Sequence, residues 1–283
     1  MTGTIYDDTP CELGEGLLWH PEREELFWFD ILGRRLHRKG QHWQFDDYVS
    51  AAGWVDADTL LMASGTALWR FDIGTGARTH LVDVEADDPA TRSNDGRADP
   101  WGGYWIGTMG IEADPQKGAI YRYYRGALEK VVPGVTITNA ICFSPDRRFA
   151  YHTDTPSQQI MRQPLNPDTG WPDGDAVVHV DLTDTTHKAD GAVVDAAGNL
   201  WTAQWGSFRV ASYDTSGAFR EAIEFPAEQT SCPAFGGPDL STLFCTSART
   251  GLSQGQLDMH PLSGCTFVAT TRSKGQREHR VIL

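Results

Sequence analysis

The feature that most constrains this chain is a unit of about 40 residues that recurs six times. Each copy has an apolar residue, a turn rich in Asp, Pro or Gly, and then a strand rich in Trp, Tyr or Phe. Equivalent positions follow one another at steps of 36 to 51 residues, at Trp19, Val55, Ala98, Phe143, Val194 and Phe235. Four strands of about six residues with their turns need roughly 40 residues, the size of one propeller blade. The repeat therefore predicts an all-β fold, a six-bladed β-propeller.

The repeat also bears on domain organisation and on how the ring closes. A β-sandwich or barrel of many short strands is the alternative fold, but regular spacing of about 40 residues is not a sandwich feature. We expect residues 1–283 to form a single propeller domain without an internal boundary. For closure we expect a strand from residues 3–6 to pair with the last blade near residues 278–283.

Composition limits the partners and the compartment. The net charge of −14 and the pI near 5.0 argue against nucleic acid or an anionic membrane surface, because both call for clustered Lys and Arg. The N-terminus lacks a basic stretch followed by an apolar one, and no run of about 18 apolar residues occurs. We expect a soluble, cytoplasmic protein that is a monomer or a weak oligomer. The five cysteines show no CxxC spacing, so we interpret them as reduced and mostly buried.

The repeat places several polar side chains together. Four residues before each anchor, the innermost strand of each blade is expected to begin. These six positions hold Glu15, Ala51, Asn94, Asn139, Asp190 and Ser231. The innermost strands of a propeller run in the same direction along the central channel, so equivalent positions meet at one mouth of it. Four of the six side chains carry a carboxylate or amide oxygen, and we expect those four to face one another.

This set of oxygen ligands indicates a cation. A single Asp or Asn before Gly or Ala is ordinarily a turn residue. Two carboxylates and two amides across a narrow channel would repel or remain unsatisfied unless a cation lay between them. Oxygen ligands suit one hard divalent ion such as Ca²⁺, Mg²⁺ or Mn²⁺, with Zn²⁺ or Fe²⁺ less expected on ligand type. Two carboxylates balance a divalent charge and leave positions open for water or substrate.

Other motifs are weaker. Residues 251–255, GLSQG, match the G-x-S-x-G nucleophile elbow, but that motif needs a helix after it and we predict none there. We interpret the match as chance. No HExxH motif or Cys/His cluster supports zinc-protease chemistry. Arg92 is either a surface arginine or a group that binds substrate oxygens. Asp95 is interpreted as a loop brace, and His187 as a solvated loop residue or site lining. Trp205, just after a strand, is a candidate pocket wall, whereas the tryptophans within strands are interpreted as core between blades: Trp28, Trp69, Trp105 and Trp201.

Several ordered motifs resemble the senescence marker protein/regucalcin/gluconolactonase-like family over nearly the whole chain: LGEG, RSNDG, TNA, KADGAVV and the closing KGQREHRVIL. The resemblance implies a six-bladed propeller with one divalent metal in its channel and hydrolysis of sugar lactones to sugar acids. It implies that Glu15, Asn139 and Asp190 bind the metal, and that Arg92 and Asn94 contact the substrate.

Two positions depart from the family pattern. The acidic substrate-contacting residue of some members falls near Asp114, with Glu112 close by, in a loop of variable length. Because that loop varies in length, the departure leaves the identity of the substrate open. Ala140 stands where the family usually has Gly, and we expect little effect on the neighbouring ligand Asn139.

These observations predict a metal-dependent hydrolase that opens aldono- or aldarolactones. In this hypothesis the metal polarises the lactone and Asp190, the catalytic residue, takes a proton from the attacking water. One alternative is a propeller that only binds a divalent cation such as calcium, which would have no use for Arg92 and Asn94. Another is a propeller esterase acting on bulkier esters, for which a more apolar channel mouth is expected.

Overall fold

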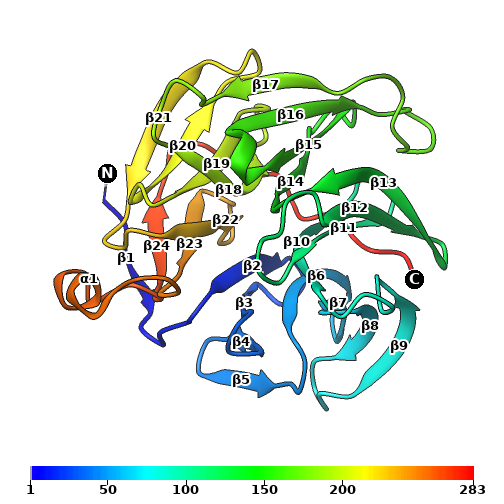
Figure 1. Cartoon of the computed structure of the whole chain (residues 1–283), viewed down its shortest axis with the longest axis horizontal. Coiled ribbons are helices and arrows are strands. Elements are labelled where there is room, and N and C mark those ends of the chain that lie inside the picture. The colour runs from blue at the N-terminus through cyan, green and yellow to red at the C-terminus, as the bar shows by residue number, and fades with distance from the viewer. Residues whose placement is uncertain (1) are drawn as a thin grey trace.

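Six four-stranded antiparallel sheets surround a central channel in the computed structural model, which describes residues 2–283 (Figure 1). The first blade contains β2 (Gly14–His20), β3 (Glu25–Asp30), β4 (Arg35–Arg38) and β5 (Gln41–Gln44). The second contains β6 (Val49–Asp56), β7 (Thr59–Ser64), β8 (Ala67–Asp72) and β9 (Arg78–Asp83). The third contains β10 (Thr91–Ala98), β11 (Tyr104–Gly110), β12 (Gly118–Tyr124) and β13 (Ala127–Val135).

The remaining blades follow the same plan. The fourth contains β14 (Thr138–Phe143), β15 (Phe149–Asp154), β16 (Gln159–Pro164) and β17 (Val177–Asp181). The fifth contains β18 (Lys188–Val194), β19 (Leu200–Trp205), β20 (Arg209–Tyr213) and β21 (Phe219–Glu224). The sixth contains β22 (Thr230–Gly236), β23 (Thr242–Ser247), β24 (Thr266–Thr270) and, as its outermost strand, β1 (Thr4–Asp7). The six-bladed β-propeller predicted from the repeat is confirmed.

The ring closes through β1, but not as predicted. Strand β1 pairs with β24, with Thr4 opposite Val268 and Ile5 opposite Phe267. The expected partner near residues 278–283 was therefore wrong. Those residues instead lie across the end of the channel. The Val281 side chain anchors them there, since it is completely buried in an apolar cluster between the second and third blades. The Val281 N–H donates to the Trp54 carbonyl at 2.9 Å, which holds the segment there.

Neighbouring blades pack through apolar faces. In the cluster between the second and third blades, Leu61 and Leu68 meet Tyr104 and Ile106. This is the arrangement that period-two alternation of apolar residues predicts for stacked sheets. The tryptophans predicted to lie between blades are Trp28, Trp105 and Trp201, all completely buried, and Trp69, which is half-buried.

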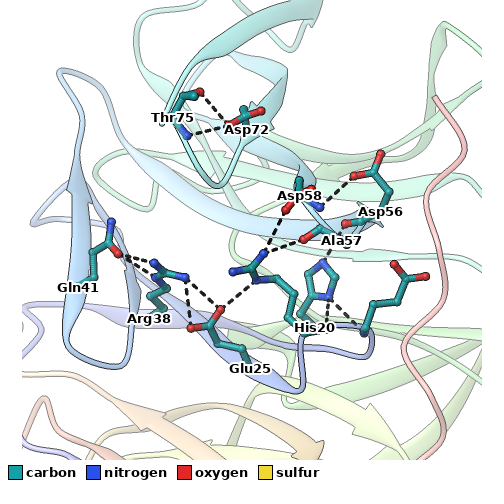
Figure 2. A network of polar contacts seen from close by, with 11 residues as sticks. His20, Glu25, Arg38, Gln41, Asp56, Ala57, Asp58, Asp72 and Thr75 are labelled. Atoms are coloured by element: carbon teal, nitrogen blue, oxygen red, sulfur yellow. Dashed lines mark hydrogen bonds and ion pairs between the residues drawn. The ribbon is translucent and has the colours of Figure 1, made fainter.

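Polar contacts join the first two blades at the ends of the strands (Figure 2). The His20 Nε2 lies 3.0 Å from the Asp56 carbonyl, and the His20 Nδ1 accepts backbone N–H groups of Glu22 and Arg23 at 3.3 Å. Arg23 in turn donates to the Ala57 carbonyl at 3.0 Å. Burial lowers the pKa of His20, which matches a neutral ring that donates from one nitrogen and accepts at the other.

Helices are few and short. The α-helix α1 (Gln254–Met259) has six residues and the 3₁₀-helix η1 (Thr155–Ser157) has three. Within residues 2–283, neither has the length or the apolar character needed to span a membrane.

Candidate active site

One mouth of the channel opens into a cavity of about 290 Å³. Its polar lining comes from the innermost strands of four blades: Glu15 of β2, Arg92 and Asn94 of β10, Asn139 of β14, and Asp190 of β18. The structure thus brings together the four oxygen-bearing residues that the repeat aligned. Of the other two aligned positions, Ala51 lies in an apolar cluster, and Ser231 donates a hydrogen bond to the Gly14 carbonyl beside Glu15.

Bulges in the inner strands aim these side chains at the channel. The pairing of β2 with β3 shifts register between Glu15 and Leu18. Similar shifts occur after Ser93, Asn139 and Ala189, at the positions of the other three residues. A β-bulge bends its strand and redirects a side chain, which is why bulges are common next to active sites.

Two of these bulges need a left-handed residue directly after the polar one. Gly16 follows Glu15 with φ 59°, and a Cβ there would lie 2.2 Å from the Ser50 carbonyl oxygen. Ala140 follows Asn139 with φ 58°. Alanine keeps the conformation that glycine has in the first blade, at a cost of about 1 kcal/mol.

A chain of hydrogen bonds orients the two amides. The Arg92 Nη1 donates to the Asn94 Oδ1 at 2.8 Å, and the Asn94 Nδ2 donates to the Thr138 carbonyl at 2.8 Å and to the Asn139 Oδ1 at 3.3 Å. The Asn139 Nδ2 donates to the Thr155 Oγ1 at 2.9 Å. Each amide nitrogen is therefore occupied by protein, and the Asn139 Oδ1, with one long hydrogen bond, keeps a lone pair for a further partner.

The two carboxylates have no such partners. Glu15 and Asp190 are 7% and 4% exposed, and among residues 2–283 no side chain donates a hydrogen bond to either. Burial raises the pKa of Glu15, and the negative charges of Asp190 and Asp95 raise it further, while Arg92 acts in the opposite direction. Burial also raises the pKa of Asp190, with the charge of Asp95 adding to it. Two buried carboxylates beside an amide oxygen form a donor set that fits a hard divalent cation.

Asp95 has a structural contact instead. The Asp95 Oδ2 accepts the Ile141 backbone N–H at 2.7 Å, which links β10 of the third blade to β14 of the fourth. Burial raises the pKa of Asp95 to about 6. The residue acts as a brace, as interpreted from the sequence, although it lies within a strand and not in a loop.

The walls of the cavity include residues that the sequence did not single out. Segments between the second and third strands of two blades supply Thr155, Pro156 and Thr250. Trp205, the last residue of β19, also lines the cavity, as the pocket-wall interpretation expected. Lys188 was missed. It lies two residues before Asp190 on β18, and the two-residue period of a strand could have indicated it.

Three other predicted features lie elsewhere. Asp114 and Glu112 are exposed in the loop between β11 and β12, and neither lines the cavity. The contact of Asp114 with substrate therefore stays a prediction. The His187 Nδ1 lies 2.9 Å from the Ser207 Oγ, also outside the cavity lining.

The GLSQG segment was expected to precede no helix, and this was wrong. Ser253 is the N-cap of α1 and accepts a hydrogen bond from the Gln256 backbone N–H. The Ser253 hydroxyl also donates to the Gln256 side chain at 2.9 Å. A helix forms because this capping box satisfies its first N–H groups. The exposed hydroxyl serves the cap, which agrees with a chance match to the nucleophile motif.

Comparison with known proteins adds to this geometry. Residues 13–249 match the model of the SMP-30/Gluconolactonase/LRE-like region. The chain belongs to this family. An L-arabinolactonase of Azospirillum brasilense is 36% identical over 292 residues, covering 98% of this chain and 94% of that protein. A 6-deoxy-6-sulfogluconolactonase of Pseudomonas putida is 33% identical over 276 residues, covering 95% and 94%.

A solved structure of the same family is also similar. It is the crystal structure of a calcium-binding protein, regucalcin, from Agrobacterium tumefaciens. The TM-score is 0.97 at 40% sequence identity, and the match covers 100% of this chain and 98% of that one. The family resemblance stated from the sequence motifs is confirmed.

Proposed function

We propose that this protein is a divalent-metal-dependent lactonase that opens sugar lactones to the corresponding sugar acids. The observation that carries the proposal is the convergence of Glu15 and Asp190, two buried carboxylates that accept no side-chain hydrogen bond, with the Arg92–Asn94 pair on one cavity. Relatives covering nearly the whole chain are described as lactonases, which supports the same reaction class.

Glu15, Asn139 and Asp190 would hold the cation. Their oxygen donors favour Ca²⁺, Mg²⁺ or Mn²⁺ over Zn²⁺ or Fe²⁺. When bound, such an ion supplies Lewis-acid polarisation of the carbonyl and activation of water. The remaining steps belong to side chains of this chain.

Arg92 and Asn94 orient the substrate. One guanidinium nitrogen of Arg92 is held by the Asn94 Oδ1, so the rest of the planar group is fixed and its other N–H groups are available to sugar hydroxyl or carboxylate oxygens. Asp190 then takes a proton from the attacking water. As the water oxygen bonds to the carbonyl carbon, the bond from that carbon to the ring oxygen breaks, and Asp190 returns the proton to the leaving oxygen.

The size of the cavity favours a small substrate, although Leu13, Met109 and Ile137 give it apolar walls beside the polar groups. A volume of about 290 Å³ lies at the lower end of the range for ligand pockets. This suits a monosaccharide lactone better than a bulky ester, and so disfavours the esterase alternative. Binding of a cation alone, the second candidate, is favoured by the similar calcium-binding protein, but it leaves the other N–H groups of the buried Arg92 guanidinium without a role.

A pH-indicator assay tests the proposal. Metal-stripped protein is supplied with Ca²⁺, Mg²⁺, Mn²⁺ or Zn²⁺ and offered gluconolactone, arabinolactone, xylonolactone, galactonolactone and an aldarolactone. We expect metal-dependent acid release from at least one lactone. Calcium binding without acid release from any lactone would favour the second candidate. In the same assay, a raised KM for Asp114→Asn would support substrate contact by the β11–β12 loop.

A further inference from the structure

A second group of potential metal ligands lies outside the channel cavity. Cys11, Asp30 and His37 each offer one ligand atom, and these atoms lie within 4.8 Å of one another. Their exposed fractions are 0%, 3% and 3%. Asp30 ends β3 and His37 lies in β4, while Cys11 belongs to the linker between β1 and β2. The cluster therefore joins the first blade to the segment that leads in from the sixth.

His37 is buried without a hydrogen-bond partner. Within the described chain, residues 2–283, no partner contacts the buried Nε2, and the ring stacks on Trp28 with centroids 5.5 Å apart and planes 10° apart. Burial lowers the pKa of His37 to about 4, so the ring is neutral at pH 7. A neutral imidazole carries the lone pair that binds metals. An unpaired buried polar group costs free energy unless something binds to it.

The Asp30 carboxylate is held in place but not saturated. The Oδ1 accepts backbone N–H groups of Leu13 and Gly33, and the Oδ2 accepts that of Glu12, all at 3.0 Å. An ionised carboxylate has about four lone-pair sites, so the Oδ2 keeps one for a further partner. Hydrogen bonds that orient a ligand in this way strengthen metal binding.

The cluster has an access route. A cavity of about 350 Å³ reaches the cluster at His37 and is also lined by Asp7, Asp8, Trp28, Arg38 and His42, among others, but not by Cys11 or Asp30. Arg38 is paired with Glu25 at 3.3 Å, so the two aspartates leave negative charge on this route. A small cation can therefore reach His37 without crossing the apolar core.

We propose that Cys11, Asp30 and His37 form a binding site for a soft divalent cation of the Zn²⁺ class. A thiolate with an imidazole and a carboxylate is a donor set that Zn²⁺ favours, unlike the all-oxygen set of the channel. Water from the adjacent cavity completes the four ligands. On binding, the Cys11 thiol releases its proton to solvent and the sulfur bonds the metal. Tetrahedral bonds of about 2.0–2.3 Å bring the three ligand atoms closer to one another by up to about 1.5 Å.

The consequence is a clamp on ring closure. The linker carrying Cys11 connects β1, which completes the sixth blade, to β2, which begins the first. A metal joining Cys11 to Asp30 and His37 would stabilise this junction by mass action on the folded state. This proposal does not depend on the proposed lactonase activity.

Titration of the metal-stripped full-length protein with Co²⁺ tests the site. Thiolate coordination to Co²⁺ gives a charge-transfer absorption in the near ultraviolet, which an all-oxygen channel site cannot give. We expect one such site per chain, lost in Cys11→Ser and weakened at least tenfold in His37→Gln. The Glu15→Gln and Asp190→Asn variants should keep the absorption, as should Cys245→Ser, which removes another buried thiol. Zn²⁺ should raise the Tm of the wild type by more than that of Cys11→Ser, which keeps only the channel site.

Three outcomes would overturn the site: no thiolate absorption at millimolar Co²⁺, an absorption that persists in folded Cys11→Ser, or one that disappears with the channel variants. If Cys11→Ser does not fold, as judged by circular dichroism, the Co²⁺ affinity of His37→Gln is the deciding measurement. Unchanged Co²⁺ affinity in that variant contradicts the proposal.

Discussion

The two mouths of the channel differ in whether their buried charged side chains are paired within the protein. At the open mouth, Glu15 and Asp190 are buried without a side-chain donor among residues 2–283. At the other mouth, the C-terminal segment crosses the strand ends and brings Glu278 into an ion pair with Arg97. Both partners of that pair have side chains only 10% exposed.

One strand reaches both environments. Strand β10 carries Arg92 and Asn94 at the open mouth and Arg97 at the closed one. At the closed mouth the backbone also contributes, because the Trp54 Nε1 donates to the Glu278 carbonyl at 3.0 Å. Charge that is neutralised within the protein serves stability, whereas charge left without a partner is available to a ligand. Variants of the two mouths should therefore separate stability from activity.

The largest effect is expected for Asp190→Asn at the open mouth. Loss of the proton acceptor and of one metal ligand should lower kcat by about 10²–10⁴-fold in initial-rate assays. The metal-free variant should be at least as stable as the metal-free wild type in denaturant unfolding, because a buried carboxyl group without a side-chain donor is removed.

Asp175→Asn is the matched control, because Asp175 is exposed and lies outside the cavity lining. It should keep wild-type rates. Activity retained in Asp190→Asn would exclude this residue as the base, and a large loss of stability would contradict the contrast between the mouths.

The next effect is expected for Glu278→Gln at the closed mouth. This change leaves the Arg97 guanidinium buried without its counter-charge, which should lower the free energy of unfolding by about 3–5 kcal/mol. Denaturant unfolding measures it, and the kcat of the folded fraction should be kept. The double variant Arg97→Met with Glu278→Met should recover much of the loss. A stable Glu278→Gln with reduced kcat would mean that the ion pair serves the reaction.

A smaller effect is expected for Lys188→Met, which tests substrate class at the open mouth. Lys188 lines the cavity and is an ion-pair partner of no carboxylate in the described part of the chain. Its loss should lower kcat/KM about tenfold for a lactone carrying a carboxylate or sulfonate, and less for a neutral one. Equal losses for both substrates would show that Lys188 does not read substrate charge.

The smallest effect concerns the two left-handed residues beside the ligands. Ala140→Gly gives the fourth blade the residue that the first blade has at Gly16 and should raise the free energy of unfolding by about 0.5–1 kcal/mol. Ala150→Gly is the control, because Ala150 is equally buried in the same blade but has no positive φ. This variant should have a lower free energy of unfolding than the wild type. Thermal unfolding of both variants measures the sign of the change in stability. A lower Tm for Ala140→Gly would contradict backbone strain at Ala140.

Sequence periodicity was enough to predict the fold and the innermost strands. Counting four residues back from the repeat anchors reached Glu15, Asn94, Asn139 and Asp190, because every blade uses the same strand to line the channel. The partner of β1 was not predictable in this way. Residues 274–283 have no alternation, and their position depends on Val281 filling a space between two blades.

Other features depend on contacts that local patterns do not encode. Cys11 and His37 meet only because the linker after β1 folds against β3 and β4, so no metal-binding spacing appears in the sequence. The position of Asp114 depends on the path of a loop, which strand periodicity does not define. The left-handed conformation of Ala140 follows from the bulge in β14, where the sequence shows an ordinary alanine.

Metal binding and activity at the open mouth are measured together in one experiment. Metal-stripped Cys11→Ser protein, which lacks the proposed second site, is titrated with Mn²⁺ while bound metal and lactone hydrolysis are measured in the same sample. We expect hydrolysis to rise in proportion to bound metal up to one ion per chain, and we expect Asp190→Asn in this background to bind Mn²⁺ more weakly and to keep only the reduced kcat. Full hydrolysis by the stripped protein in excess chelator would contradict this expectation.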